Sequence, residues 1–140
     1  MKKLHLALAV RNLEKSIIEY NQRLGCKPIA IKKGRYALWR TDILNLSITQ
    51  SFDDAGNLRH LGFEDPDVLK IFSEKDIDGF EWEYFSAEQQ RQEILKYYPD
   101  IHYPEISISK GLSSSPAVSQ ITYQPLSCQS PRTMRSPCLC

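Results

Sequence analysis

The chain has 140 residues, of which 41% are hydrophobic and 25% are charged, so it has the composition of a globular protein with one domain and a tail. Residues 1–105 carry 15 Lys and Arg against 17 Asp and Glu, and this net charge of −2 argues against a nucleic-acid partner. The longest apolar runs are too short to cross a bilayer, and the start of the chain reads as a strand instead of a signal peptide. We therefore expect a cytoplasmic protein without a membrane partner.

The first stretch of the chain predicts a strand that leads directly into an amphipathic helix. Residues 4–10 alternate strictly, with leucines on one face and His5 and two alanines on the other. Asn12 is a good N-cap, apolar residues follow at helical spacing, and Gly25 suits the left-handed residue that ends a helix. His5 therefore shares its face with the smallest side chains, which leaves room for a metal and a substrate.

Further strands and a second helix are expected along the chain. Strands are expected over 27–33, 36–41, 43–50, 58–64 and 79–85, and a helix over 87–97. In the strand over 43–50, alternate polar residues form one face, which would suit a solvated site opposite His5. His60 has Gly62 as a neighbour on its face, so the second histidine also lies beside a residue without a side chain.

Residues 106–140 differ in character from the rest of the chain. They contain nine Ser, four Pro and no acidic residue, and they show no sustained periodicity. Such a segment cannot bury enough apolar surface to order itself, so we expect a disordered tail after a folded domain over 1–105.

Three segments of the chain form a recurring combination: H-x-A-x-x-V-x-N-L-x-x-S-I-x-x-Y over 5–20, the strand that begins Tyr36-Ala37, and H-L-G-F-E over 60–64. Together they resemble the vicinal oxygen chelate superfamily, which includes glyoxalase I, bleomycin and fosfomycin resistance proteins, extradiol dioxygenases and organoarsenical lyases. The resemblance implies an α+β fold in which βαβββ modules form an open, barrel-like mixed sheet. It also implies that His5 and His60, from the opening strands of the two modules, bind a metal.

The resemblance places the third metal ligand near the end of the second module. The segment D-I-D-G-F-E-W-E-Y-F over 76–85 is similar to the family's D-P-D-G-N-x-W-E-x-F, whose glutamate falls on Glu83. Only 22 residues separate His60 from Glu83, so this choice implies an abbreviated second module. The alternative ligand is Glu105, at the end of a longer module, but strong helix formers over 87–97 favour Glu83.

Two histidines and one carboxylate would form a facial triad suited to Fe²⁺ and also able to hold Mn²⁺, Ni²⁺ or Zn²⁺. Glyoxalase-like members add a fourth ligand, usually a glutamate on the last strand of the first module. That strand here offers no strong anionic ligand, only Asn45, Ser47, Thr49 and Gln50. The departure disfavours glyoxalase I chemistry and favours a three-ligand site.

Candidate substrate contacts lie beside these ligands. They are Tyr36, Trp39 and Arg40 on the strand over 36–41, and Arg59 next to His60. The alternative is that the aromatic side chains pack in the core and the arginines are solvated. The sequence does not single out a catalytic residue.

The resemblance implies a metal-dependent lyase, isomerase or dioxygenase that acts on a small oxygen-rich molecule. Two alternatives stay open: a metal-free protein that sequesters a drug-like ligand, as bleomycin resistance proteins do, and a truncated inactive member. Many members pair modules between subunits, so the resemblance also implies a homodimer.

Overall fold

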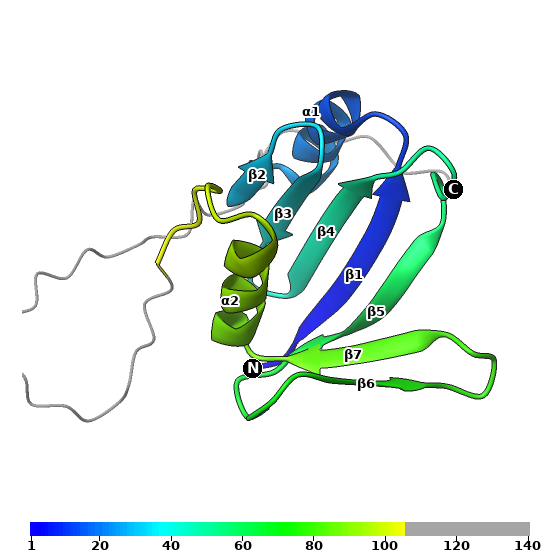
Figure 1. Ribbon diagram of the computed structural model, residues 1–140, viewed down its shortest axis with the longest axis vertical. Helices are drawn as coiled ribbons and strands as arrows, with labels where there is room; N and C mark the ends of the chain where they lie inside the picture. Colours follow the sequence, from blue (N-terminus) through cyan, green and yellow to red (C-terminus); the bar gives the residue numbers. More distant parts are fainter. Residues whose placement is uncertain (106–140) are drawn as a thin grey trace, which may run out of the picture.

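Within residues 1–105, which are the residues that the computed structural model describes, seven strands form one mixed, open sheet and two helices pack against it (Figure 1). The α+β class expected from the sequence is therefore confirmed, while the tail predicted for 106–140 lies outside the described residues. In chain order the elements are β1 (Lys3–Val10), α1 (Leu13–Leu24), β2 (Ala30–Lys32), β3 (Tyr36–Arg40), β4 (Leu44–Gln50), β5 (Leu58–Glu64), β6 (Phe72–Lys75), β7 (Glu81–Phe85) and α2 (Ala87–Tyr97).

The strand order places the first strand in the middle of the sheet. The order is β2-β3-β4-β1-β5-β7-β6. Strand β1 pairs with β4 in parallel and with β5 in antiparallel orientation, and β5 pairs with β7 in parallel. The antiparallel β1–β5 pair thus joins the first half of the chain to the second.

Both helices begin with the caps that short polar side chains provide. The Asn12 side chain accepts a hydrogen bond from the backbone N–H of Lys15, and Gly25 ends α1 with φ at 69°. Ser86 and Gln89 form a capping box at the start of α2. Neither of these described helices is long and apolar enough to span a membrane.

The two helices cover opposite faces of the sheet. Apolar residues of α1 pack against Ala37 and Trp39 of β3, whereas Ile94 of α2 packs against Tyr36 and Leu38 of the same strand. Alternate residues of a strand point to opposite faces, so β3 contributes to both cores. On β1 the face that holds His5 is the more buried one, and it is the face on which α2 lies.

The structure differs from the expected elements in two places. The strand expected over 27–33 is limited to β2, at the edge of the sheet. Strand β6, which the sequence did not predict, is exposed along its whole length and pairs with β7. Between β5 and β7 there is thus a β-strand and no described helix, in agreement with the short spacing between His60 and Glu83.

Candidate metal centre

Three side chains from three neighbouring strands meet on the face that α2 covers. The Nε2 atoms of His5 and His60 lie 3.1 Å apart, and the Oε2 atom of Glu83 lies 3.1 Å from His60 Nε2 and 4.0 Å from His5 Nε2. Metal–ligand bonds of about 2.0 to 2.2 Å place neighbouring ligand atoms roughly 3 Å apart. These three residues could therefore hold a metal ion.

The register of the sheet explains this convergence. His5 pairs with Gly62 across β1 and β5, and Gly62 pairs with Glu83 across β5 and β7, so the two ligands flank a residue without a side chain. A Cβ atom at Gly62 would lie 1.8 Å from the carbonyl oxygen of Glu83. Glycine is required here because the Glu83 backbone occupies the place that a Cβ atom would take.

A buried amide orients the His5 ring. Asn45 Nδ2 donates to Glu64 Oε2 and to Gln90 Oε1, both at 2.8 Å, and Asn45 Oδ1 accepts from Gln90 Nε2 at 3.1 Å. Because the Glu64 carboxylate accepts only from the amide nitrogen, it fixes which atom of the amide is the oxygen. That oxygen lies 2.9 Å from His5 Nδ1. Nδ1 therefore carries the proton and donates it, and the Nε2 lone pair faces the cavity, which is the tautomer that a metal requires.

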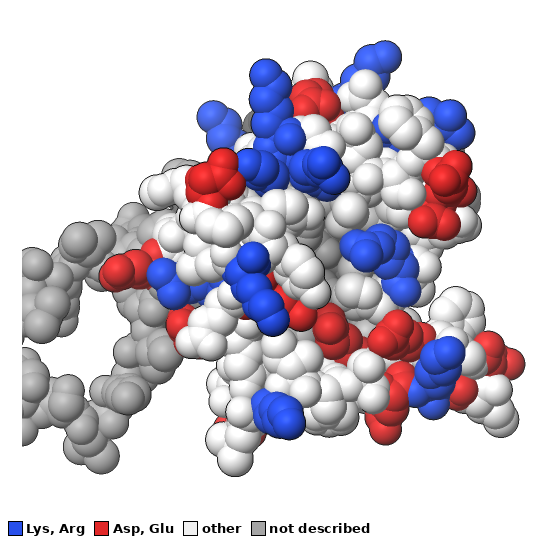
Figure 2. All heavy atoms as spheres, viewed as in Figure 1, with Lys and Arg blue, Asp and Glu red and all other residues white. Residues whose placement is uncertain are grey.

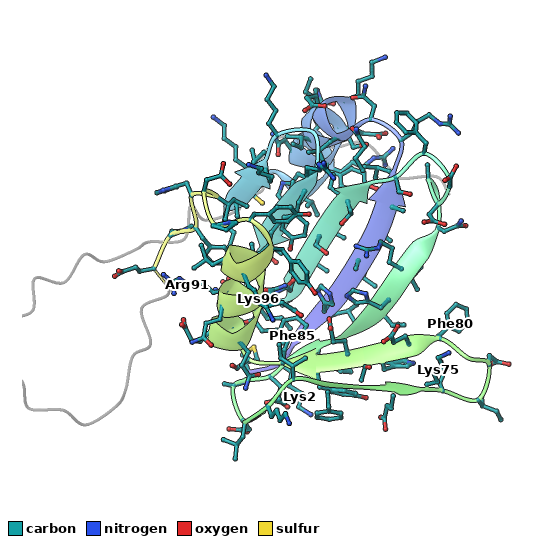
Figure 3. All side chains as sticks on the ribbon, in the orientation of Figure 1. Lys2, Lys75, Phe80, Phe85, Arg91 and Lys96 are labelled. Atoms are coloured by element: carbon teal, nitrogen blue, oxygen red, sulfur yellow. The ribbon has the colours of Figure 1, made fainter. Side chains whose placement is uncertain are left out.

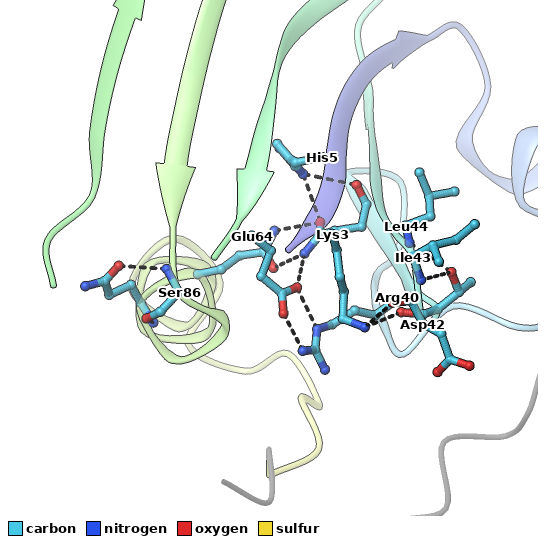
Figure 4. A network of polar contacts seen from close by, with 12 residues as sticks. Lys3, His5, Arg40, Asp42, Ile43, Leu44, Glu64 and Ser86 are labelled. Atoms are coloured by element: carbon cyan, nitrogen blue, oxygen red, sulfur yellow. Dashed lines mark hydrogen bonds and ion pairs between the residues drawn. The ribbon is translucent and has the colours of Figure 1, made fainter. Parts of the chain in front are cut away.

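Glu64 is held in turn by Arg40, as the close view of the network shows (Figure 4). Arg40 Nε donates to Glu64 Oε2 at 2.8 Å, and Arg40 Nη2 pairs with Oε1. Burial opposes ionisation of Glu64, but the hydrogen bonds and charge of Arg40 outweigh it, so the pKa of this carboxyl group is lowered. Arg40 thus holds Glu64 in place and is not among the residues that line the cavity, so it is not placed as the substrate contact that the sequence suggested.

The charge states of the ligands suit a cation. Burial lowers the pKa of His5, which keeps this imidazole neutral. Burial works against the ionised form of Glu83, but the hydrogen bond and charge of His60 prevail, so the pKa of Glu83 is lowered. Phe85, labelled in Figure 3, lies where β7 leads into α2. Its ring meets the buried His5 ring edge-on, with the two ring centroids 4.9 Å apart.

The three candidate ligands lie in a cavity of about 420 Å³ between the sheet and α2. The sheet supplies its floor and α2, with Tyr98 just after it, supplies one wall. The lining residues are His5, Tyr36, Ser47, Thr49, Arg59, His60, Glu83, Phe85, Gln90, Glu93, Ile94, Tyr97 and Tyr98. The cavity is large enough for a small organic molecule.

The candidate substrate contacts divide between this cavity and the rest of the molecule. Tyr36 and Arg59 line the cavity, whereas Trp39 lies on the opposite face of the sheet. Trp39 is fully buried against α1, where its Nε1 donates to Asn21 Oδ1 at 3.0 Å. Glu105, the alternative ligand, is exposed and does not belong to the group of possible ligands found among the described residues.

The sequence does not predict which residues support the site. In it Asn45 is a weak candidate ligand on the polar face of the strand over 43–50, Glu64 belongs to the H-L-G-F-E segment, and Gln90 is one of the helix formers over 87–97. Helix α2 also brings Glu93 to the cavity, where burial, followed by the charge of Glu83, raises its pKa. The position of Asn45 on the polar face of β4 was the one available signal, because that face was expected to lie opposite His5.

Among known proteins, no family model matches this chain, and no curated protein matches it.

Proposed function

We propose that this protein is a metal-dependent enzyme of the vicinal oxygen chelate type, a lyase, isomerase or dioxygenase that acts on a small oxygen-rich molecule. The order of elements supports the proposal, since β1, α1, β2, β3 and β4 follow as strand, helix and three strands. Strands β5, β6 and β7 would form the abbreviated second module, because the parallel β5–β7 pair repeats the parallel β1–β4 pair.

The observation that carries the proposal is the convergence of His5, His60 and Glu83 inside a cavity. Three ligand atoms lie within 4.8 Å of one another, and all three side chains line the same hollow. A divalent ion held by two imidazoles and one carboxylate has open positions, at which it polarises bound oxygen atoms as a Lewis acid or activates O₂.

The other residues of the cavity would bind and orient the substrate. Ser47 and Thr49 place hydroxyl groups on the floor, beside Tyr36. Phe85 and Ile94 supply apolar surface that excludes water from the metal ligands. Hydroxyl groups near a metal suit a substrate with several oxygen atoms, because each oxygen can accept or donate a hydrogen bond.

The second candidate is a metal-free protein that sequesters a small molecule in the same cavity. One observation favours it: His60 Nε2 and Glu83 Oε2 already lie 3.1 Å apart, within hydrogen-bonding distance, so these two side chains can satisfy each other without a metal. In that case the histidines would contribute to packing and hydrogen bonding only.

Metal content after purification without added chelator separates the two candidates. We expect one Fe, Mn, Ni or Zn ion per wild-type chain by elemental mass spectrometry, and much less in His60→Ala and Glu83→Gln. Glu105→Gln is the matched control, because it removes the alternative carboxylate and should keep the metal. Wild-type protein that carries no metal, and takes up none when any of the four ions is supplied, would contradict the enzyme proposal.

A further inference from the structure

An irregularity in β5 turns a cationic side chain into the cavity. Ala7 of β1 pairs with His60, but the next residue, Leu8, pairs with Leu58, so Arg59 is an extra residue in the ladder. In a regular strand Arg59 and His60 would point to opposite faces. Both line the cavity, and we attribute this to the bulge, because bulges re-aim side chains in this way.

A hydroxyl group of β4 then fixes the guanidinium group. Arg59 Nη1 donates to Thr49 Oγ1 at 2.9 Å, although β1 lies between β5 and β4. On the cavity face, β1 carries Ala9 opposite Thr49, and its methyl group leaves room for the arginine side chain to cross. The crossing holds the guanidinium group at the lining of the cavity, where Arg59 stays exposed to solvent and accessible to a ligand.

The remaining donors of this group have no anionic partner in the described part of the chain. None of the ion pairs among residues 1–105 includes Arg59. Among the described residues that line the cavity, the basic ones are the two histidines and Arg59. Glu83 contacts His60 at 3.1 Å, and the charge of Arg59 makes only the last of the contributions that lower the pKa of Glu83.

We propose that Arg59, positioned by Thr49, binds an anionic group of the molecule that enters this cavity. A planar fork of N–H donors matches the oxygens of a carboxylate or a phosphate-type group. The inference rests on the proposed function and narrows its substrate class to small anions whose other oxygens reach the metal ligands.

The test uses inorganic phosphate and acetate as probes, with the side-chain Nε–Hε signal of Arg59 followed by NMR in metal-free protein at constant ionic strength. We expect the chemical shifts of the Arg59 Nε–Hε signal and of the Thr49 methyl group to change as the probe is added and to reach a plateau. Binding should weaken at least about tenfold in Arg59→Gln, because a charge-assisted hydrogen bond is lost, with calorimetry as the readout. It should weaken severalfold in Thr49→Val. Tighter binding of phosphate or of acetate indicates which kind of anionic group the site prefers.

Arg23→Gln is the matched control, since Arg23 lies on α1 and pairs with Glu19 at the surface. Anion binding that is unchanged in Arg59→Gln, or lost equally in Arg23→Gln, would overturn the inference. If Arg59→Gln does not fold, Arg59→Lys replaces it: the lysine keeps the charge but not the fork of N–H donors, so an affinity equal to that of wild type would also overturn the inference.

Metal content is measured separately, and Arg59→Gln should retain the ion. Loss of metal binding with intact anion binding would therefore reject the enzyme proposal alone.

Discussion

At His5, a chain of buried polar groups determines which ring nitrogen faces the cavity. Asn45 can present its oxygen to the ring only because Glu64 and Gln90 accept its two N–H bonds. When Glu64 is ionised, both of its oxygens can accept hydrogen bonds, including the one from Asn45. Arg40 keeps Glu64 ionised. The protonation state of the Glu64 carboxyl group thus bears on the orientation of His5, a candidate ligand two contacts away.

Glu64→Gln tests this network through the pH dependence of stability. The folded-state pKa of Glu64 lies below its ordinary value. Ionised Glu64 therefore contributes to the free energy of unfolding above about pH 4.5, and this contribution is lost as the pH falls through the lowered pKa. We expect the variant to be less stable than wild type at pH 7, near the lower end of the roughly 3 to 5 kcal/mol for breaking a buried pair. The difference should narrow below about pH 4.5 in urea denaturation.

Glu19→Gln is the control, because Glu19 forms an exposed pair with Arg23 on α1. Removing this pair should change the free energy of unfolding by less than about 1 kcal/mol at every pH. If the free energies of unfolding of wild type and Glu64→Gln differ by the same amount at every pH from 7 to 3, the carboxyl group contributes no pH-dependent stability.

At the scale of the elements, the pairing of β5 with β7 depends on Gly62. It lies between His5 on β1 and Glu83 on β7, and the Glu83 backbone occupies the space that a side chain would need. The same position therefore sets the spacing of the β5–β7 pair and the distance between the candidate ligands.

Gly62→Ala should separate β5 from β7 and move Glu83 away from the histidines. We expect a loss of about 1 to 3 kcal/mol or more in the free energy of unfolding, together with loss of any stabilisation by metal. Gly79→Ala is the control: Gly79 has φ at 88° but no atom within 4 Å of the added Cβ. It should cost about 1 to 2 kcal/mol through backbone strain and keep the metal effect. Full metal-dependent stabilisation in Gly62→Ala would contradict the account.

The elements with clear periodicity or capping residues were predictable from the sequence. The helix between Asn12 and Gly25, the strand Leu58–Glu64 and the helix Ala87–Tyr97 agree with the expectation almost residue for residue. Strand β6 was not predictable, because all four of its residues are exposed and show no alternation of apolar and polar side chains. Its pairing with β7 is what makes it a strand.

The opposite orientation of Tyr36 and Trp39 on β3 is predictable from the sequence alone. Tyr36 and Trp39 are three residues apart, so in a strand they must point to opposite faces. They could not both line one cavity, and the structure places Tyr36 in it and Trp39 against α1. Which of the two faces the cavity depends on where α1 packs, and no local pattern in the strand specifies that.

At the scale of the whole molecule, the candidate site forms where the two halves of the chain meet. His5 and His60 are 55 residues apart in sequence and are brought together by the β1–β5 pair. Alternation within each strand predicted the face of each histidine, but it could not predict that these strands are neighbours. That expectation came from the resemblance to a family in which two modules share one metal.

The homodimer expected from the resemblance stays a prediction. Aromatic rings follow one another across β5, β7 and β6, with Phe63 stacked on Trp82 and Phe72 stacked on Tyr84. Phe72 is 50% exposed, and acidic side chains gather around the β6–β7 hairpin in the lower part of the surface view (Figure 2).

The central claim is that His5, His60 and Glu83 bind a metal ion in the folded protein, and thermal unfolding with and without metal tests it most directly. A ligand that binds only the native state stabilises it by about 2.7 kcal/mol at a hundredfold excess over Kd, which for a domain of this size raises Tm by about 10 °C. We expect such a rise with Fe²⁺, Mn²⁺, Ni²⁺ or Zn²⁺ at pH 7.5 in wild type and in Glu105→Gln, and none in His60→Ala. A wild-type Tm that none of the four ions changes, or an equal rise in His60→Ala, would contradict the claim.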